Sequence, residues 1–221
     1  MANIFDLFKQ IETPREPSSA PITHLIVGLG NPGAEYAHTR HNAGFLALEY
    51  LRQRENARID RAKYHALVGE CTLGGVRALL MLPQTYMNAS GQAVRDAADF
   101  YKIPPERIIV VCDDTNLEVG RLRVRGKGSD GGQRGVRDII YQLGADNFPR
   151  IKVGVGQKPH PDYNLSDWVL SNFSPSEQKA LFSAFPTVCD GITLLLQASS
   201  MKPCSAATAS GPKPRAAYDP L

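Results

Sequence analysis

A short stretch at residues 27–44, VGLGNPGAEYAHTRHNAG, concentrates the polar side chains that hydrolytic chemistry would use. Five such residues lie within a dozen positions of one another: Asn31, Tyr36, Arg40, His41 and Asn42. An imidazole has an ordinary pKa of about 6.5, so His41 could take a proton from water at neutral pH. We therefore expect a hydrolytic site here. The alternative for His41 considered alone is a histidine that only satisfies a loop.

A buried strand and a glycine-rich turn position this stretch. Residues 22–29 form a nearly continuous apolar run, which is typical of a buried strand in an α/β sheet. The turn GNPG at residues 30–33 ends regular structure and lets the backbone approach a ligand closely. Asn31 thus follows the carboxyl end of a strand, where open α/β sheets bind their ligands. We do not expect a dinucleotide site at this turn, because Asn31, Pro32 and Gly33 are taken not to complete the motif G-x-G-x-x-G.

Two further strand ends add polar groups. The loop PQTYMNASG leads from a strand at residues 76–82 into a helix, so Asn88 projects from a second strand-to-helix junction. Residues 108–111 are the clearest buried strand and deliver Asp113 and Asp114 at its end. Adjacent acids could ligate Mg²⁺, but neighbouring side chains on a strand point to opposite faces. Only one of the two is therefore expected to serve the cleft.

Other patterns give the remaining elements. Gly74 and Gly75 predict a tight hairpin between strands at residues 64–73 and 76–82. Apolar residues spaced i, i+3, i+4, i+7 predict a helix that begins near Val136. A capping box with Pro inside it predicts a helix start at Ser174.

The two ends are expected to lie outside one central domain, residues 22–198. Residues 1–21 contain a pattern for a short amphipathic helix and then a Pro/Ser linker. That helix would dock on its own domain, the favoured interpretation, or bind a partner. Residues 199–221 are rich in Ala, Ser, Pro and Lys and predict a disordered tail.

Composition limits the class of protein. With 221 residues, 43% hydrophobic and 21% charged, the chain fits one globular domain of ordinary makeup. No apolar run approaches the length of a membrane span, and the N-terminus lacks the features of a secretory signal. The four cysteines form no C-x-x-C pair, which favours reduced thiols in the cytoplasm.

A basic segment runs from Arg121 to Arg137. It contains six basic residues against one acidic residue, Asp130. A solvated surface strand would explain it. A face that grips the phosphates of a nucleic acid would explain it equally well, because basic residues alternate along a strand and a glycine-rich loop follows.

Together, four separated segments resemble the bacterial peptidyl-tRNA hydrolase family. They are GLGNPGAEYAHTRHNAGF, QTYMNASG, IIVVCDDTNLEVGRLRVR and GKGSDGG, in that family's order and spacing, and the resemblance covers roughly residues 22–197. It implies an α/β fold, a single-domain αβα sandwich with a mixed, mostly parallel central sheet. It also implies a cytoplasmic monomer without metal or cofactor that hydrolyses the ester between peptide and tRNA. The partner would be peptidyl-tRNA, with transient proximity to the ribosome.

The resemblance also implies roles for individual residues. His41 would be the general base that activates water, and Asp113 would orient it, as the acid does in hydrolytic triads. The residues expected to bind substrate or tRNA are Asn31, Tyr36, Tyr86, Asn88, Arg125 and Lys152, together with Arg134, which is expected on its charge and not on the resemblance. Within that set, Arg125 and Lys152 would grip the 5′ phosphate of tRNA.

One pair of residues departs from the family pattern. Gln133 and Arg134 stand where the family usually has a histidine and then an asparagine. A cation at a helix N-terminus is unfavourable unless an anion binds close by, so we expect Arg134 to contact the tRNA acceptor end electrostatically. The alternative is that it points into solvent.

The sequence leaves two rival functions open. A non-catalytic RNA-binding relative on the same fold is the first. A metal hydrolase that uses His38, His41, Asp113 and Asp114 is the second, and it is disfavoured because the H-E-x-x-H helix is missing.

Overall fold

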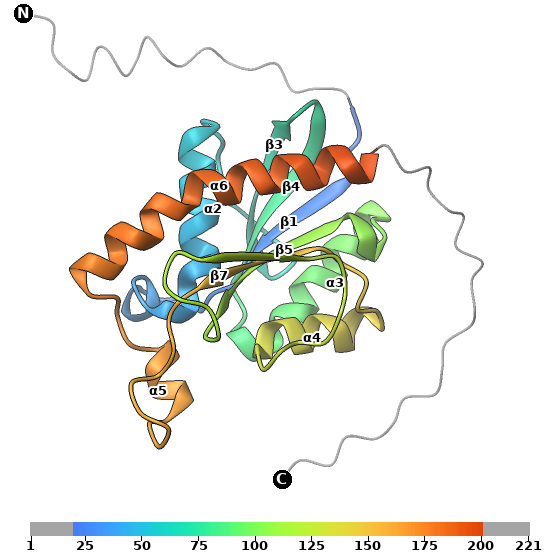
Figure 1. The fold of residues 1–221 in the computed structure, drawn as a ribbon. Helices are drawn as coiled ribbons and strands as arrows, with labels where there is room; N and C mark the ends of the chain where they lie inside the picture. The colour runs from blue at the N-terminus through green and yellow to red at the C-terminus, as the bar shows by residue number, and fades with distance from the viewer. Residues whose placement is uncertain (1–19, 201–221) are drawn as a thin grey trace, which may run out of the picture.

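The apolar runs form one seven-stranded sheet in the computed structural model, which describes residues 20–200 (Figure 1). The strands are β1 (His24–Gly28), β2 (Arg61–Lys63), β3 (Ala66–Leu73), β4 (Val76–Pro83), β5 (Ile108–Asp114), β6 (Leu122–Arg125) and β7 (Arg150–Gly154). Their order in the sheet is β2-β3-β4-β1-β5-β7-β6. The α-helices are α2 (Ala43–Arg54), α3 (Ser90–Tyr101), α4 (Arg134–Leu143), α5 (Leu165–Val169) and α6 (Pro175–Ser200).

The centre of the sheet is parallel and its edges are antiparallel. Strands β4, β1, β5 and β7 run side by side in one direction. At one edge β3 and β2 pair antiparallel, and at the other edge β6 pairs antiparallel with β7. The mixed sheet predicted for an αβα sandwich is confirmed. The carboxyl ends of the four parallel strands consequently meet at one edge, where their loops can converge.

Helices cover both faces of the sheet and create two cores. Residues of α2 and α6 pack with Ile26 on one face, whereas residues of α3 and α4 pack with Leu25 and Val27 on the other. This division follows from the alternation of side chains along a strand. Because β1 is buried throughout, its ends are held firmly by both layers.

A close approach between β1, α2 and β5 brings the polar stretch after β1 onto the sheet edge. A side chain at Gly44, in the first turn of α2, would place its Cβ 2.3 Å from the carbonyl oxygen of Val111 on β5. Only glycine permits this approach. The short 3₁₀ helix η2 (Arg40–Asn42), just before α2, is thereby pressed against the end of β5.

The longest helix, α6, begins as its capping box predicts. The backbone N–H of Ser174 donates to Glu177 Oε2 (2.8 Å), and the N–H of Glu177 lies 3.4 Å from Ser174 Oγ. By length and composition α6 could cross a membrane. Its apolar face is instead buried against the sheet, at Leu181, Ala184, Phe185, Val188, Cys189, Ile192 and Leu196, so it is a core helix.

Most predicted elements are present, and a few are new. The hairpin turns at Gly74 and Gly75 with φ of 54° and 83°, as a tight turn requires. The three-residue strand β2 and the short helix α5 were not predicted. Helix α6 extends to Ser200, two residues past the predicted domain boundary. The predicted N-terminal helix and the tail after residue 200 lie outside the described residues.

Candidate active site

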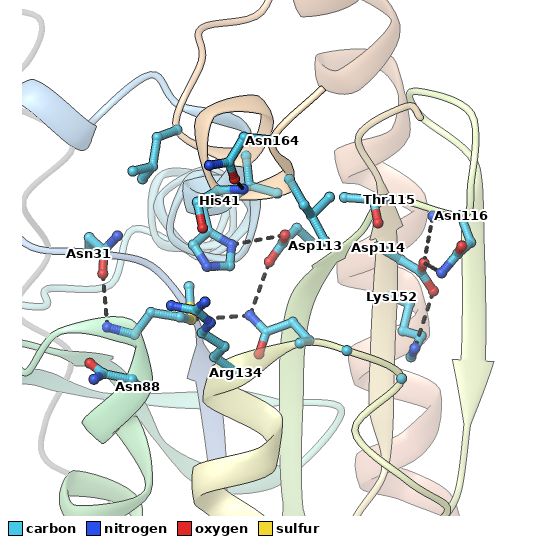
Figure 2. Close-up of a pocket in the computed structure, with 18 of the residues that line it drawn as sticks. Asn31, His41, Asn88, Asp113, Asp114, Thr115, Asn116, Arg134, Lys152 and Asn164 are labelled. Carbon is cyan, nitrogen blue, oxygen red and sulfur yellow. Dashed lines mark hydrogen bonds and ion pairs between the residues drawn. The ribbon is translucent and has the colours of Figure 1, made fainter. Parts of the chain in front are cut away.

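The carboxyl edge of the parallel strands is hollowed into a pocket of about 700 Å³ (Figure 2). Loops after β1, β4 and β5, the start of α4, and α5 contribute to its wall. The lining residues include Asn31, His41, Tyr86, Met87, Asn88, Asp113, Asp114, Gln133, Arg134, Lys152 and Asn164. Segments far apart in the sequence therefore meet at one site, as the position of the strand ends predicted.

His41 and Asp113 form a buried hydrogen-bonded pair. His41 Nδ1 lies 2.9 Å from Asp113 Oδ2, and the two side chains are only 11% and 3% exposed. A carboxylate accepts but does not donate, so Nδ1 carries the proton and Nε2 is left as the basic nitrogen. Burial lowers the pKa of His41, but the charge and hydrogen bond of Asp113 raise it by more. The pKa of His41 therefore lies above its ordinary value of 6.5, although Arg134 opposes this rise.

Asn31 is held in one orientation from both sides. Its backbone N–H donates to Asn42 Oδ1 (2.8 Å), and Asn42 Nδ2 donates back to the carbonyl oxygen of Asn31 (3.0 Å). The side-chain oxygen of Asn31 accepts from the backbone N–H of Met87 (2.8 Å). With that oxygen occupied, the Nδ2 group of Asn31 remains as a donor. Asn42, noted in the sequence without a role, thus fixes the turn that presents this donor.

Gln133 completes the surroundings of Asp113. Its Nε2 donates to Asp113 Oδ1 (3.0 Å) and lies 3.1 Å from Met87 Sδ, while its Oε1 accepts from the N–H of Val136 (2.7 Å). Gln133 is thus the N-cap of α4 and at the same time a donor to the acid. Both carboxylate oxygens of Asp113 are therefore bonded. In the sequence Gln133 stands out only as a departure from the family pattern, but its place before an apolar helical run is the signal for a cap.

The neighbouring acid has a different partner. Asp114 Oδ2 lies 3.2 Å from Lys152 Nζ, and Asp114 Oδ1 accepts from the backbone N–H of Asn116 (2.9 Å). Burial raises the pKa of Asp114, but these bonds lower it by more, so its net pKa is below the usual value. The two acids therefore have different partners. The expectation that only one serves the cleft was wrong, because both line the pocket.

Several predicted residues occupy other places. Tyr36 does not line the pocket, because it ends a separate 3₁₀ helix, η1 (Ala34–Tyr36), and is only half-buried there. Arg125 is exposed on β6, away from His41. His38 is exposed too, and among residues 20–200 no group of three or more His, Cys, Asp or Glu could hold a metal ion.

The expectation that the glycine turn after β1 does not match the dinucleotide motif was wrong. Glycines 28, 30 and 33 do match the G-x-G-x-x-G spacing, so the sequence alone does not exclude a dinucleotide site. A dinucleotide turn opens directly into a helix whose N-terminus holds the pyrophosphate. Here the turn leads into η1, and α2 begins only at Ala43. The structure therefore lacks that arrangement at this turn.

Comparisons with known proteins point to one family. The family model for peptidyl-tRNA hydrolase matches residues 25–213. A peptidyl-tRNA hydrolase of Caldicellulosiruptor bescii is 47% identical over 174 residues, which cover 79% of this chain and 90% of that protein. One of Lachnospira eligens is 44% identical over 78% of this chain and 92% of its own length.

The chain belongs to the peptidyl-tRNA hydrolase family.

A solved member of the family has the same fold. The crystal structure of the peptidyl-tRNA hydrolase from Acinetobacter baumannii is 36% identical, superposes with a TM-score of 0.75, and covers 83% of this chain and 93% of its own. As a member of the peptidyl-tRNA hydrolase family, the protein hydrolyses the ester bond of peptidyl-tRNA, which is its substrate. The alternative of a non-catalytic RNA-binding relative is not favoured.

Proposed function

We propose that His41 is the general base of this peptidyl-tRNA hydrolase and that Asp113 orients it. The observation that carries the proposal is the 2.9 Å bond between His41 Nδ1 and Asp113 Oδ2 in the pocket wall. It leaves Nε2 free to take a proton from water, and it stabilises the imidazolium that forms. Gln133 supports the same pair, because it bonds the second oxygen of Asp113.

The reaction then follows in two proton transfers. Water loses a proton to Nε2 of His41 as its oxygen bonds to the ester carbonyl carbon. The bond from that carbon to the 3′ oxygen of tRNA breaks as the tetrahedral intermediate collapses, and the imidazolium returns the proton to the leaving oxygen. Free tRNA and a peptide with a carboxylic acid end result, and the acid then loses its remaining proton to solvent. In this scheme His41 acts first as base and then as acid.

Asn31 and Asn88 are the proposed donors to the carbonyl oxygen, which gains negative charge during attack. Asn31 Nδ2 can donate because the oxygen of the same amide is held by Met87, and Asn88 lines the same pocket on η3 (Met87–Ala89). Each preorganised donor of this kind is worth roughly 10²–10³ in rate. Because amides are neutral, they do not oppose protonation of His41 during catalysis.

The tRNA side of the proposal uses separate residues. Arg125 and Lys152 would bind the 5′ phosphate, and Arg134 and Tyr86, which line the pocket, would contact the acceptor end. Tyr86 is 61% exposed, so its ring can meet a base or a peptide side chain. We propose no contact for Tyr36. We further propose that the protein acts as a cytoplasmic monomer close to the ribosome, in keeping with its buried free cysteines.

The test is to compare His41→Ala with His38→Ala, its exposed neighbour outside the pocket. Loss of a general base should lower kcat for peptidyl-tRNA roughly 10²–10⁴-fold. Affinity for deacylated tRNA should stay the same, because the basic residues are separate. The His38 variant should behave as the wild type in both assays. Turnover near wild type in the His41 variant would disprove the proposed base.

A further inference from the structure

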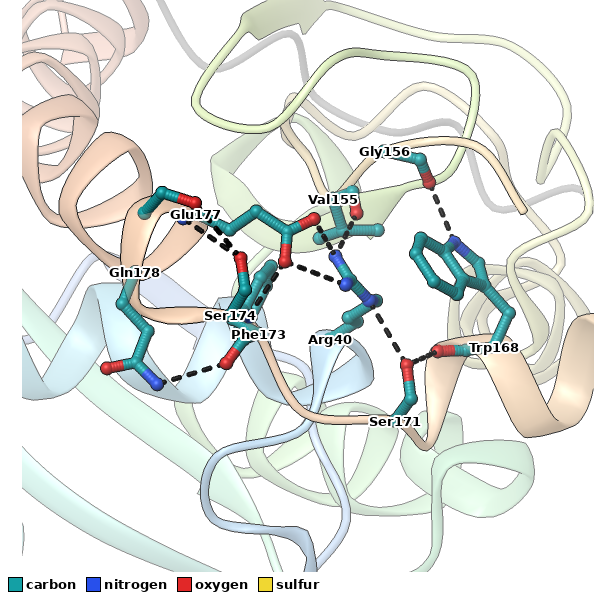
Figure 3. Close-up of polar contacts among 10 residues, drawn as sticks. Arg40, Val155, Gly156, Trp168, Ser171, Phe173, Ser174, Glu177 and Gln178 are labelled. Atoms are coloured by element: carbon teal, nitrogen blue, oxygen red, sulfur yellow. Dashed lines mark hydrogen bonds and ion pairs between the residues drawn. The ribbon is translucent and has the colours of Figure 1, made fainter. Parts of the chain in front are cut away.

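Beside His41 lies a cation that the mechanism does not use. Arg40 is 4% exposed, and its guanidinium is packed 3.7 Å from the centroid of the Trp168 ring and 4.9 Å from that of Phe173. An arginine so far from water is costly unless its charge and its donors find partners. The partners that Arg40 finds come from three separate segments (Figure 3).

Each of the three guanidinium nitrogens of Arg40 donates. Nη1 and Nη2 bind the carboxylate of Glu177 in a forked pair, both at 2.9 Å. Nη1 also donates to the carbonyl oxygen of Val155 (2.8 Å), and Nε donates to Ser171 Oγ (3.2 Å). Burial raises the pKa of Glu177, but the bonds from Arg40 and Ser174 lower it by more, so the net pKa is below its ordinary value. Both partners are thus charged, and the pair is a true ion pair.

The backbone around Arg40 joins the same segments. Its N–H donates to the carbonyl oxygen of Ser171 (3.0 Å), and Thr39 forms a bridge with Asn172. Trp168 is itself tied to the strand end, because its Nε1 donates to the carbonyl oxygen of Gly156 (2.8 Å). Arg40 therefore connects η2 to the end of α5, to the chain after β7 and to the first turn of α6.

Two of these segments form neighbouring parts of the pocket wall. Helix η2 carries His41, next to Arg40 in the chain. Helix α5 and its flanks line the other part of the pocket with Asn164, Leu165, Ser166, Val169 and Leu170. The N-cap bond of α5 is local, from Ser166 to Asn164. The segment is also held by the backbone contacts of Arg40 and Thr39 with residues 171–172 and by the bond from Trp168 to Gly156. The Arg40 side chain joins this segment to α6 and to the chain after β7, so the distance between the imidazole and the α5 wall depends in part on Arg40.

We propose that Arg40 is a positioning residue, which through its ion pair with Glu177 and its stacking on Trp168 fixes the α5 wall of the pocket relative to His41. This deepens the proposed function and rests on His41 as the base. A forked, stacked guanidinium sets both distance and angle, whereas a lysine ammonium is a point charge. A displacement of about 1 Å between a catalytic group and its substrate can cost 10²-fold in rate.

The central experiment compares Arg40→Lys with Arg54→Lys at a temperature where both variants are fully folded by circular dichroism. Arg54 is a matched control, because it also binds α6, through Asp190 at 2.9 Å, but on the surface and away from the pocket. We expect Arg40→Lys to lower kcat about 10–100-fold and to leave the affinity for deacylated tRNA unchanged. Arg54→Lys should change neither. The fluorescence of Trp168, the only tryptophan, should shift in the first variant alone.

A second variant separates positioning from stability. Arg40→Met combined with Glu177→Gln removes both charges, so neither partner is left as an unpaired ion at this buried site, and it keeps an acceptor for the N–H of Ser174. Replacing a buried ion pair by neutral groups is often neutral for stability. We therefore expect this double variant to melt near the wild type and still to have the reduced kcat.

Three results would overturn the proposal. They are wild-type kcat in Arg40→Lys, recovery of kcat in the stable double variant, or an equal loss in Arg54→Lys. The acid limb of the pH–rate profile should stay in place, because Glu177 neutralises Arg40; a shifted limb would mean that Arg40 acts through charge. If His41→Ala remained active, the base would be wrong, and that failure would be visible independently of the Arg40 variants.

Discussion

The pocket around His41 and the strand β6 both carry polar side chains, but they hold them differently. In the pocket, His41, Asp113 and Asn31 are buried, and each has named partners at 2.8–2.9 Å. On β6, Arg123 and Arg125 are exposed, and within residues 20–200 no carboxylate forms an ion pair with either. The first region fixes positions, and the second leaves charges available.

Lys152 lies between the two regions and shares features of both. It lies opposite Arg123 in the register of β6 and β7, yet its side chain is only 12% exposed and pairs with Asp114. A neutralised, buried cation attracts a distant phosphate less than a free one does. We therefore expect the chemistry to depend on preorganised hydrogen bonds, and tRNA binding to depend on unpaired charge and on salt.

The largest expected effect comes from removing the negative charge of Asp113, the partner of His41. Asp113→Asn should lower kcat roughly 10²–10⁴-fold, because His41 loses both its orientation and its counter-charge. Asp113 raises the pKa of His41, and the base must be unprotonated, so the acid limb of kcat/KM should move to lower pH in the variant.

The measurement is a pH series of kcat/KM with Asp114→Asn as control. Asp114 contacts Lys152 rather than His41, so its variant should leave the midpoint of the acid limb unchanged. An equal shift in both variants would show that general pocket charge, and not the specific bond, sets the pKa of His41.

The second effect concerns the exposed region. Replacing Arg125 and Lys152 by alanine should weaken tRNA binding and flatten its salt dependence, since each lost phosphate contact removes about one unit of slope. Arg125→Ala alone should account for more of the change, because its charge is unpaired. Arg58→Ala is the control, since Arg58 is exposed near the opposite edge strand β2. Equal slopes in all variants, measured by titration at several salt concentrations, would place the tRNA site elsewhere.

The smallest expected effect concerns Arg134, which lines the pocket but is exposed like the arginines of β6. Arg134 is exposed in the pocket at the first position of α4 and lowers the pKa of His41. Arg134→Asn should therefore move the acid limb to higher pH, opposite to Asp113→Asn, and should modestly weaken tRNA binding. Arg137→Asn is the control, because Arg137 is paired with Asp130. An unchanged acid limb and unchanged affinity would leave Arg134 as a solvent-exposed substitution.

The sequence predicted those parts of the molecule that depend on local pattern. Apolar runs located the strands, and the position of strand ends brought Asn31, Asn88 and Asp113 to one edge, where the structure has the pocket. The capping box located the start of α6, because its two residues lie only three positions apart. In each case neighbours within a few positions decide the outcome.

Features that depend on distant partners could not be predicted this way. Nothing near Tyr36 in the chain shows that η1 turns it away from the pocket. The donation from Gln133 to Asp113 joins residues 20 positions apart, and that from Arg40 to Glu177 joins residues 137 positions apart. Such pairings are decided by tertiary packing, which the spacing of apolar residues along the sequence does not reveal.

The place of α6 at the end of the described chain has a consequence for biosynthesis. Helix α6 covers the sheet whose central strand, β1, is made first, and His24 Nε2 bonds Ser199 Oγ across 175 positions. A ribosome makes the chain from the N-terminus, so β1 must wait for its covering layer. A nascent chain that has not reached Glu177 lacks the partner of Arg40. While it is itself a peptidyl-tRNA, this hydrolase therefore lacks the contact that we propose to position its pocket wall until α6 has been made.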